Sequence, residues 1–502
     1  MATIVQEPKT TLPAGPTPLP VIGNAFSFRT DPLAFFQQLQ RTYGNMATVY
    51  LGRVPIVLLF QPEHVRYLLV EHPRIFSNRE FTQGSGGSNA GILDEGLLTI
   101  DGEAHRQQRR AVQPAFHKKR VEGYAEAMVQ YTQEVLKTWH AGDVVDVSRA
   151  MQELTLRIVG QCLFNIDLDR QLSDLGSAFN GVIGTQPGIL ETLLNVQIDQ
   201  PFTTYGKRMA AIRHLDTLIY TLIAQRRGDT QDRNDVLSML LTAPDARDAA
   251  HAEVPLNDKQ VHDHIMTFIA AGHETTANAL TWTFYLLSEQ PEVREKLMTE
   301  LRTVLNGRVP TTEDMANMPY LDWVLNESMR LYPPAWIQGR SSSEEFELDG
   351  VRFPAGTLFL LSQWVTHRIP EIWGDPDVFR PERWDPANEQ KVPAGAYFPF
   401  GAGPRICIGM PFAQLESKLI LTTILQKYTP RTTPGYRAEI SPLITLRPKE
   451  HLRMMLLPTA TEASAAPSWE QVLRVPYASQ NEAAERRGCR SAFAGIFDLL
   501  RL

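Results

Sequence analysis

The sequence contains very little cysteine: Cys162, Cys407 and Cys489 are the only thiols in 502 residues. Three scattered cysteines cannot build a disulfide framework, and none of them forms a Cys-x-x-Cys pair of the kind used for zinc or redox chemistry. Because free thiols persist in a reducing compartment, this usage favours a cytoplasmic protein.

Long apolar runs and an excess of positive charge are missing as well. No stretch reaches the roughly 18 uninterrupted apolar residues that a membrane-spanning helix needs, and residues 1–11 have no apolar signal core, so we expect no transmembrane anchor. The chain carries 49 Lys and Arg against 56 Asp and Glu, a formal net charge of −7, and we expect no nucleic-acid partner. Its 43% hydrophobic content excludes wholesale disorder and allows a sizeable core.

The pattern along the chain predicts a mainly α protein with a smaller β-rich region. Helical periodicity occupies most of residues 103–296, and residues 257–290 are apolar around the whole circumference, which predicts a buried central helix. Further helices are expected at residues 32–43 and 411–428. Strand patterns, including one hairpin with a turn at Gly52, occur at residues 48–60, 346–353 and 443–457.

Three segments are expected to differ from the rest. Prolines 13, 16, 18 and 20 make residues 12–24 stiff and extended, within a proline-rich N-terminal segment of residues 1–24. The composition of residues 459–502 indicates a C-terminal extension of unknown role. The folded domain should therefore occupy residues 25–458. Within it, the glycine-rich residues 79–102 predict a long loop, either a lid over a site or an ordinary surface loop.

The strongest chemical signal is the segment 400–409, which reads FGAGPRICIG. Glycines and a proline bracket Cys407 in a tight loop, and an apolar helix follows. Backbone amides pointing at the sulfur and the positive end of the next helix would favour thiolate over thiol. A thiolate held in this way is a nucleophile or a metal ligand.

A second signal lies in the middle of the central helix, where residues 271–276 read AGHETT. Glycine and threonine are poor residues for a helix interior. We expect a local opening there, with the acid Glu274 and the hydroxyl of Thr275 aimed into a pocket; a kinked core helix with satisfied polar groups is the alternative. A zinc site of the His-Glu-x-x-His type is excluded, because Ala277 stands where the second histidine would be needed.

Charged residues form two further pairs at helical spacing. Glu327 and Arg330 are three residues apart on one helix face, and His105 and Arg109 are four apart. Taken alone, such pairs are usually surface features of small energetic weight. Downstream, Arg383 supplies another cation in the segment FRPERW.

These motifs, in this order and spacing, resemble the cytochrome P450 family over about residues 12–458. The resemblance implies the P450 fold, with haem b buried between the long central helix and the cysteine loop. Cys407 would be the thiolate ligand of the iron, and Phe400 would shield the sulfur. The haem propionates would be contacted by four residues, namely His105, Arg109, Arg340 and Arg405.

The resemblance also implies roles for the remaining motif residues. Glu327, Arg330 and Arg383 would form a buried triad that fixes the loop holding Cys407. Glu274 and Thr275 would deliver the protons needed to cleave O₂. Residues 175–202 would roof the substrate pocket.

The implied activity is that of a haem-thiolate monooxygenase, which inserts one atom of O₂ into a lipophilic small molecule by hydroxylation or epoxidation. The electrons would come ultimately from NAD(P)H through a separate partner, a ferredoxin, a flavodoxin-type protein or a diflavin reductase, because no flavin or ferredoxin domain is visible. The basic run that includes Lys118 and Lys119 would dock this partner.

Apolar pocket segments favour a lipophilic substrate. A fatty acid is the leading expectation, and a terpenoid or polyketide is the alternative. Two alternatives belong to other classes of function, namely a peroxide-dependent haem enzyme and a non-catalytic haem-binding protein. Neither would need the Glu274 and Thr275 relay, so the presence of both residues favours the monooxygenase.

Overall fold

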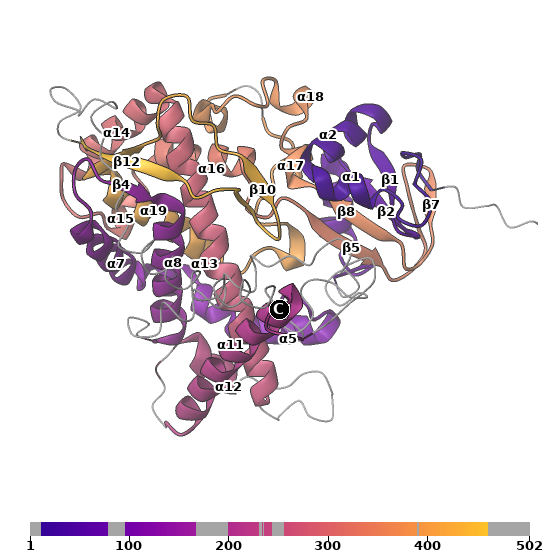
Figure 1. The fold of residues 1–502 in the computed structure, drawn as a ribbon, viewed down its shortest axis with the longest axis horizontal. Helices are drawn as coiled ribbons and strands as arrows, with labels where there is room; N and C mark the ends of the chain where they lie inside the picture. Colours follow the sequence, from indigo (N-terminus) through magenta and orange to yellow (C-terminus); the bar gives the residue numbers. More distant parts are fainter. Residues whose placement is uncertain are drawn as a thin grey trace, which may run out of the picture.

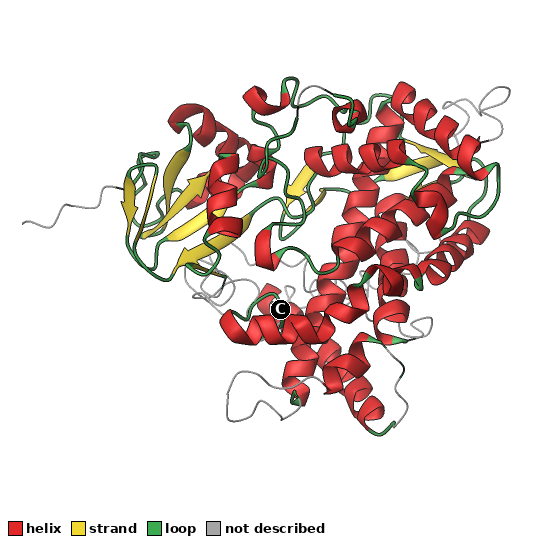
Figure 2. Ribbon diagram, turned by 180° about the vertical axis from the view of Figure 1, so that it is seen from behind, coloured by secondary structure: helices red, strands yellow, loops and turns green. Residues whose placement is uncertain are grey.

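The computed structural model describes residues 12–78, 96–166, 199–229, 233, 235–242, 256–388 and 391–459. Within these ranges the protein is mainly α with a smaller β-rich region, as the sequence predicted. Most helices gather at one end of the molecule and the largest sheet lies at the other, with two helices beside it (Figures 1 and 2). Most of the expected glycine-rich loop, the roof segment 175–202 and the C-terminal extension lie outside the described residues.

The β-rich end is built on a five-stranded sheet in the order β1-β2-β8-β5-β3. Its strands are β1 (Met46–Leu51), β2 (Val54–Leu59), β8 (Leu358–Leu361), β5 (Gln338–Ser342) and β3 (Phe76–Ser77). The predicted hairpin is confirmed: β1 and β2 pair antiparallel around Gly52, with Leu51 opposite Val54. Pro55 is tolerated inside this sheet because β8 pairs with β2 only from Ile56 onward.

The proline-rich segment lies beside this hairpin in its described part. The Thr48 amide donates to the Ala14 carbonyl at 3.2 Å, and Gly23 bridges to Leu51. The helix expected at residues 32–43 is α2 (Pro32–Tyr43), capped by Asp31, whose carboxylate accepts from the Ala34 amide at 3.0 Å; α1 (Ala25–Thr30) precedes it.

Smaller sheets lie elsewhere in the fold. Hairpins join β6 (Phe346–Leu348) to β7 (Val351–Phe353) and β10 (Ile440–Pro442) to β11 (Leu446–Pro448). A three-stranded sheet contains β4 (Val144–Asp146), β12 (Arg453–Pro458) and β9 (Tyr428–Arg431). The three-residue strand β4 was not predicted, because so short a strand between helices has no periodicity of its own.

The helical end is organised around α13 (Asp258–Glu289), the predicted central helix. It starts at a capping box in which Asn257 and Gln260 exchange hydrogen bonds of 3.0 and 2.8 Å. Larger helices around it are α7 (Ala125–Thr138), α8 (Val147–Phe164), α11 (Thr204–Arg227), α12 (Val236–Thr242), α14 (Pro291–Leu305), α15 (Thr312–Met315), α16 (Pro319–Leu331) and α19 (Met410–Leu425). They share one buried apolar cluster.

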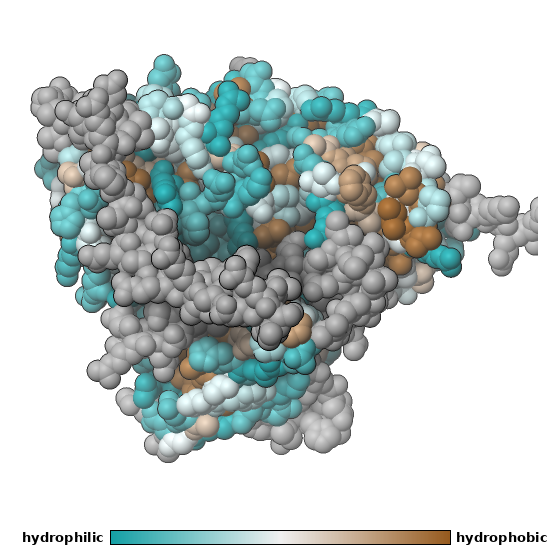
Figure 3. Space-filling view, in the orientation of Figure 1, coloured by the Kyte–Doolittle hydropathy of each residue, from teal (hydrophilic) through white to brown (hydrophobic). Residues whose placement is uncertain are grey.

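Short helices connect the two ends. They are α3 (Pro62–Arg66), η1 (Tyr67–Glu71), α5 (Gly102–Val112), η2 (Gln113–Phe116), α6 (Lys118–Glu122), α17 (Gln363–Thr366), α18 (Pro370–Trp373), η5 (Pro381–Trp384) and η6 (Gly403–Arg405). Among the described residues, no helix has the length and apolar character needed to span a membrane. Figure 3 shows brown surface at the end that carries β1 and β2, where Val21, Phe26 and Val54 are exposed.

Candidate functional site

Cys407 stands at the end of a tight loop directly before α19. Its amide donates to the Phe400 carbonyl at 2.9 Å, which closes the loop on itself. Gly403 has a φ of +68°, and an added Cβ there would lie 1.7 Å from the Leu69 carbonyl oxygen, so only glycine fits. The amides of Gly409 and Met410 donate to the sulfur, as the loop sequence predicted.

The sulfur of Cys407 is accessible although it lies deep in the protein. The side chain is exposed, yet burial is the largest influence on its thiol and raises its pKa; the Gly409 amide, the Arg109 charge and the Met410 amide lower it. The amides act in the predicted direction and favour thiolate, but without a bound cation desolvation outweighs them. An accessible thiol inside the protein faces an internal space, where a bound metal cation would deprotonate it.

Cationic side chains gather on one side of this loop. Arg405 is paired with Asp101 and also donates to the Ile100 carbonyl at 2.5 Å. Arg109 on α5 donates to the Ile406 carbonyl at 2.7 Å. Arg340 on β5 is buried, and burial with the nearby charge of Arg405 lowers its pKa to about 10.

His105 completes this group and is held neutral by it. Burial, together with Arg405 and Arg109, lowers the pKa of His105 to about 3. Asp101 is the carboxylate that influences Arg405, Arg340 and His105. With Arg109, which also acts on His105, the group holds three arginines against this one acid. The surplus of two positive charges is chemically suited to a ligand with two carboxylates, such as haem b with its two propionates.

The middle of α13, which is buried along most of its length, is accessible at residues 270–272 and at Thr275. Ala271 is exposed and Thr275 is partly exposed, whereas His273, Glu274 and Thr276 are buried. The expected break in the helix is not seen, because α13 is continuous from Asp258 to Glu289. The Thr275 hydroxyl instead donates to the Ala271 carbonyl at 2.7 Å, so its hydrogen bond is formed within the helix. The Thr275 side chain stays partly exposed.

The sequence predicted that the Glu274 side chain would point into a pocket. In the structure its carboxylate is instead hydrogen-bonded to a neighbouring hairpin. The Thr445 hydroxyl, in the turn between β10 and β11, donates to Glu274 Oε1 at 2.7 Å. Asn278 Nδ2 donates to the same hydroxyl at 3.0 Å, and Arg447 lies 4.0 Å from the carboxylate. The acid is therefore anchored to a hairpin, one residue away from the accessible Thr275.

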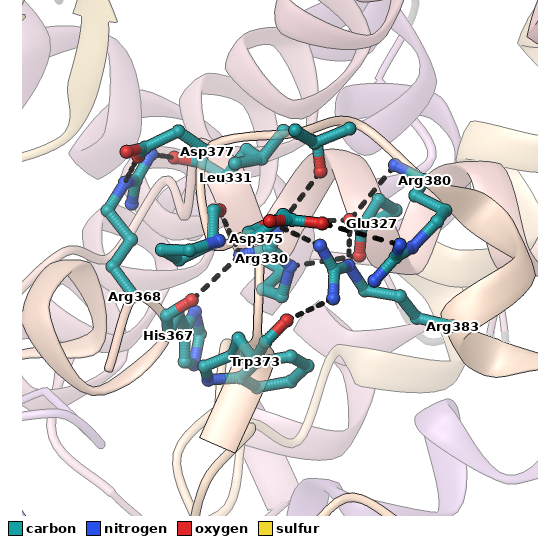
Figure 4. Close-up of polar contacts among 12 residues, drawn as sticks. Glu327, Arg330, Leu331, His367, Arg368, Trp373, Asp375, Asp377, Arg380 and Arg383 are labelled. Atoms are coloured by element: carbon teal, nitrogen blue, oxygen red, sulfur yellow. Dashed lines mark hydrogen bonds and ion pairs between the residues drawn. The ribbon is translucent and has the colours of Figure 1, made fainter. Parts of the chain in front are cut away.

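The expected ionic triad is present and buried (Figure 4). Arg330 binds Glu327 through two hydrogen bonds of 2.9 and 2.8 Å, and both residues are fully buried. Arg383 donates to Glu327 Oε1 at 3.0 Å, and the Trp384 indole donates to Oε2 at 3.0 Å. The Arg380 amide adds a further donor at 3.1 Å, so the carboxylate is satisfied on both oxygens.

The triad is connected to the cysteine loop through backbone contacts. Arg330 donates to the His367 carbonyl at 2.8 Å, and the His367 ring accepts from the Phe398 amide at 3.1 Å. Tyr397 donates to the Asn326 carbonyl at 3.1 Å. These contacts secure the residues just before Phe400.

Several site residues were not found from the sequence. Asp101 and Thr445 contact Arg405 and Glu274 across 304 and 171 residues of chain, so no local pattern marks them. No local pattern marks His367 either, because it is a lone buried histidine. The position of Asp101 directly before α5 was the one available signal.

Comparison with known proteins places this geometry in a family. The sequence profile of the Cytochrome P450 family matches residues 13–452. Cyclooctatin synthase of Streptomyces melanosporofaciens is 35% identical over 86% of this chain and 92% of its own. Pentalenene oxygenase of Streptomyces avermitilis is 32% identical over 89% and 98%. The solved structure of retinoic acid-bound cyanobacterial CYP120A1 matches with a TM-score of 0.79 at 27% identity, covering 89% of this chain and 99% of that one.

The chain therefore belongs to the cytochrome P450 family. It is a monooxygenase that uses haem b and O₂, takes electrons originating from NAD(P)H through a redox partner, and acts on a lipophilic molecule.

Proposed function

We propose that the protein is a terpenoid monooxygenase whose iron ligand is Cys407. The observation that carries the ligand assignment is an accessible sulfur, enclosed by protein and bonded by the Gly409 and Met410 amides at the start of α19. Arg109, Arg340 and Arg405, with neutral His105 as a further donor, would bind the propionates. Phe400 would cover the sulfur, since its carbonyl already holds the Cys407 amide.

The residues that would deliver protons lie on the accessible stretch of α13. Haem with a thiolate ligand supplies O₂ activation and oxygen transfer; the chain has to supply protons and an apolar chamber. Thr275 would present its hydroxyl from the accessible surface of α13. Glu274, held by Thr445, would pass protons toward it from the side of Arg447, which is partly exposed.

Loss of the Thr275 hydroxyl should separate electron use from product formation. In Thr275→Ala we expect product per NAD(P)H consumed to fall about tenfold, with peroxide released instead, because a positioned general acid typically contributes at least about 10²-fold. The measurement is product and peroxide per electron in a reductase-driven assay. Thr281→Ala is the matched control, since Thr281 makes the same 2.7 Å bond to the carbonyl four residues back but is fully buried. Unchanged coupling in Thr275→Ala would remove Thr275 from the relay.

The terpenoid assignment is supported by relatives whose names give a cyclic alkene or alkenol as the molecule oxidised, cyclooctat-9-en-7-ol 5-monooxygenase and pentalenene oxygenase. It is preferred here to the fatty-acid expectation from the sequence. Its test is titration of the haem protein with cyclic terpene hydrocarbons and alcohols and with saturated fatty acids, followed by the shift of the Soret band and by product analysis. Binding and oxidation of fatty acids but no terpenoid would reverse the preference.

We also propose that the basic surface of α5 and α6 docks an acidic electron carrier of the ferredoxin or flavodoxin type. Lys118 is 91% exposed and only weakly paired, 3.9 Å from Glu122. Helix α6 packs against α19, the helix that begins beside Cys407. Exposed positive charge therefore lies on a helix that packs against α19, which supports docking on this face.

Charge reversal at this surface should slow electron transfer. We expect Lys118→Glu/Lys119→Glu to lower the rate of reduction by the carrier about tenfold at low salt, with substrate affinity unchanged, because opposite charges accelerate encounter. Stopped-flow reduction measures the rate, and Lys207→Glu/Lys137→Glu provides an exposed double reversal away from α5 and α6. Equal reduction rates in the two variants would refute the docking surface.

A further inference from the structure

The hairpin of β10 and β11 contacts α13 through a buried polar cluster. Thr445, in the turn of the hairpin, bonds both Glu274 and Asn278 of α13, and all three side chains are at most 6% exposed. Four residues beyond Asn278, the Trp282 indole donates to the Leu446 carbonyl at 3.0 Å. Positions spaced by four residues share one face of a helix. This face of α13 is therefore fastened to the hairpin over two helical turns.

The direction of each hydrogen bond in this cluster follows from the donors that are present. The Thr445 hydroxyl has one hydrogen, and a carboxylate can only accept. The hydroxyl therefore donates to Glu274 Oε1, at 2.7 Å, and its lone pairs remain for a second donor. Asn278 supplies that donor through Nδ2, at 3.0 Å. Asn278 thus keeps the hydrogen of Thr445 directed at the acid.

The two oxygens of Glu274 have different surroundings. Thr445 bonds Oε1, and the nearest approach of Arg447, at 4.0 Å, is also to Oε1. Within the described part of the chain, no hydrogen bond is made to Oε2. Because a donated hydrogen and a positive charge already stabilise Oε1, a proton is taken up more readily at Oε2. The partly exposed Thr275 is the next residue along the helix.

We infer that Thr445 and Asn278 are positioning residues for proton delivery, which hold Glu274 so that Oε2 is the atom that carries the proton. The inference rests on the proposed function, in which Glu274 and Thr275 form the relay. A proton passes only between atoms held within hydrogen-bond reach, directly or through one water. A carboxylate that is free to turn rarely meets this condition, and a bond to Oε1 restricts that freedom.

The same helix carries a matched arrangement near its C-terminal end. Thr432 is buried and donates to Glu289 Oε1 at 2.7 Å, and its hydroxyl lies 2.9 Å from that of Ser288. Glu289 is fifteen residues beyond Glu274, about 22 Å along α13. Thr432→Val therefore removes the same kind of bond from a glutamate outside the relay, and it controls for the structural cost of the substitution.

The first test is infrared spectroscopy of the haem-loaded protein without turnover. Subtracting the spectrum of Glu274→Gln in the same background isolates the carboxylate stretch of Glu274. We expect Thr445→Val to shift this band, because the carboxylate loses a charge-assisted hydrogen bond, and Asn278→Leu to shift it less in the same direction. Thr445→Ser and Thr432→Val should leave the band in place. An unshifted band in Thr445→Val would overturn the inference.

The second test is a double-mutant cycle on the turnover rate at saturating reductase, with the compound that gives the largest Soret shift in the titration described above. We expect Glu274→Gln to slow turnover about tenfold and Thr445→Val about fivefold, each with a larger ratio of the rates in H₂O and D₂O. Thr445→Ser, which keeps the hydroxyl, and Thr432→Val should stay within twofold of the wild type.

The double variant Glu274→Gln/Thr445→Val decides between positioning and a merely structural role. Its rate should match that of Glu274→Gln within twofold, because Thr445 acts only through the acid; losses that multiply would refute the inference. A slow Glu274→Gln beside a normal Thr445→Val would remove the positioning roles alone, whereas an unchanged Glu274→Gln would remove the proposed relay itself. If Thr445→Val lacks the thiolate band with carbon monoxide, Asn278→Leu takes its place in the cycle.

Discussion

Replacing Cys407 by serine is expected to abolish the strongly red-shifted Soret band that the reduced protein gives with carbon monoxide. The Sγ atom is the one ligand that the loop presents to the internal space, and a serine hydroxyl is a harder and far less acidic donor. Monooxygenase activity should fall by at least about 10²-fold, because the electron-releasing thiolate is what favours O–O cleavage. We expect the cationic group around Asp101 to retain the haem, so haem content and band position have to be measured separately.

The control for this variant is Cys162→Ala. Cys162 is buried on α8 in the apolar core, and burial raises the pKa of its thiol far above the usual value, so we expect no ligand role for it. Its variant should keep the thiolate band. A normal band in Cys407→Ser, or a histidine-type band in the well-folded wild type, would contradict the assignment of Cys407.

Removing the charge of Glu327 is expected to destabilise the whole protein. In Glu327→Gln the fully buried Arg330 and the nearly buried Arg383 lose their shared carboxylate. Loss of one partner from a buried ionic group typically lowers the free energy of unfolding by about 3–5 kcal/mol. Haem binding should weaken in parallel, because Arg330 holds the His367 carbonyl and the His367 ring holds the Phe398 amide before the cysteine loop.

The measurement is urea unfolding with and without haem, followed by the midpoint and the haem content. Glu153→Gln serves as control, since Glu153 pairs with Arg149 at 2.8 Å while both side chains are 53% exposed. That variant should lose less than about 1 kcal/mol. A loss for Glu327→Gln no larger than for Glu153→Gln would mean that the triad is not a stabilising element.

Elements with a strong local pattern could be predicted from the sequence. The helix Pro32–Tyr43, the hairpin around Gly52 and the central helix Asp258–Glu289 match their expected positions, because periodicity, caps and turn residues act over a few residues. The strand Val144–Asp146 was missed, since it forms only by pairing with residues 453–455. The expected opening of the central helix was wrong, because the Thr275 hydroxyl is satisfied by the Ala271 carbonyl without breaking the helix.

The sequence by itself determined the class of chemistry. It contains one cysteine in a glycine-rich loop, an acid beside an alcohol, and a Glu-x-x-Arg pair, and each of these motifs is defined by residues only a few positions apart. Only the tertiary structure decided the setting of these groups. It anchors Glu274 to Thr445, brings Asp101 to Arg405, and pairs the buried Arg226 with Asp235. Such facts depend on which distant segments meet and on how far water is excluded between them. Burial and partnership of charges are properties of the packed fold, and no local pattern records them.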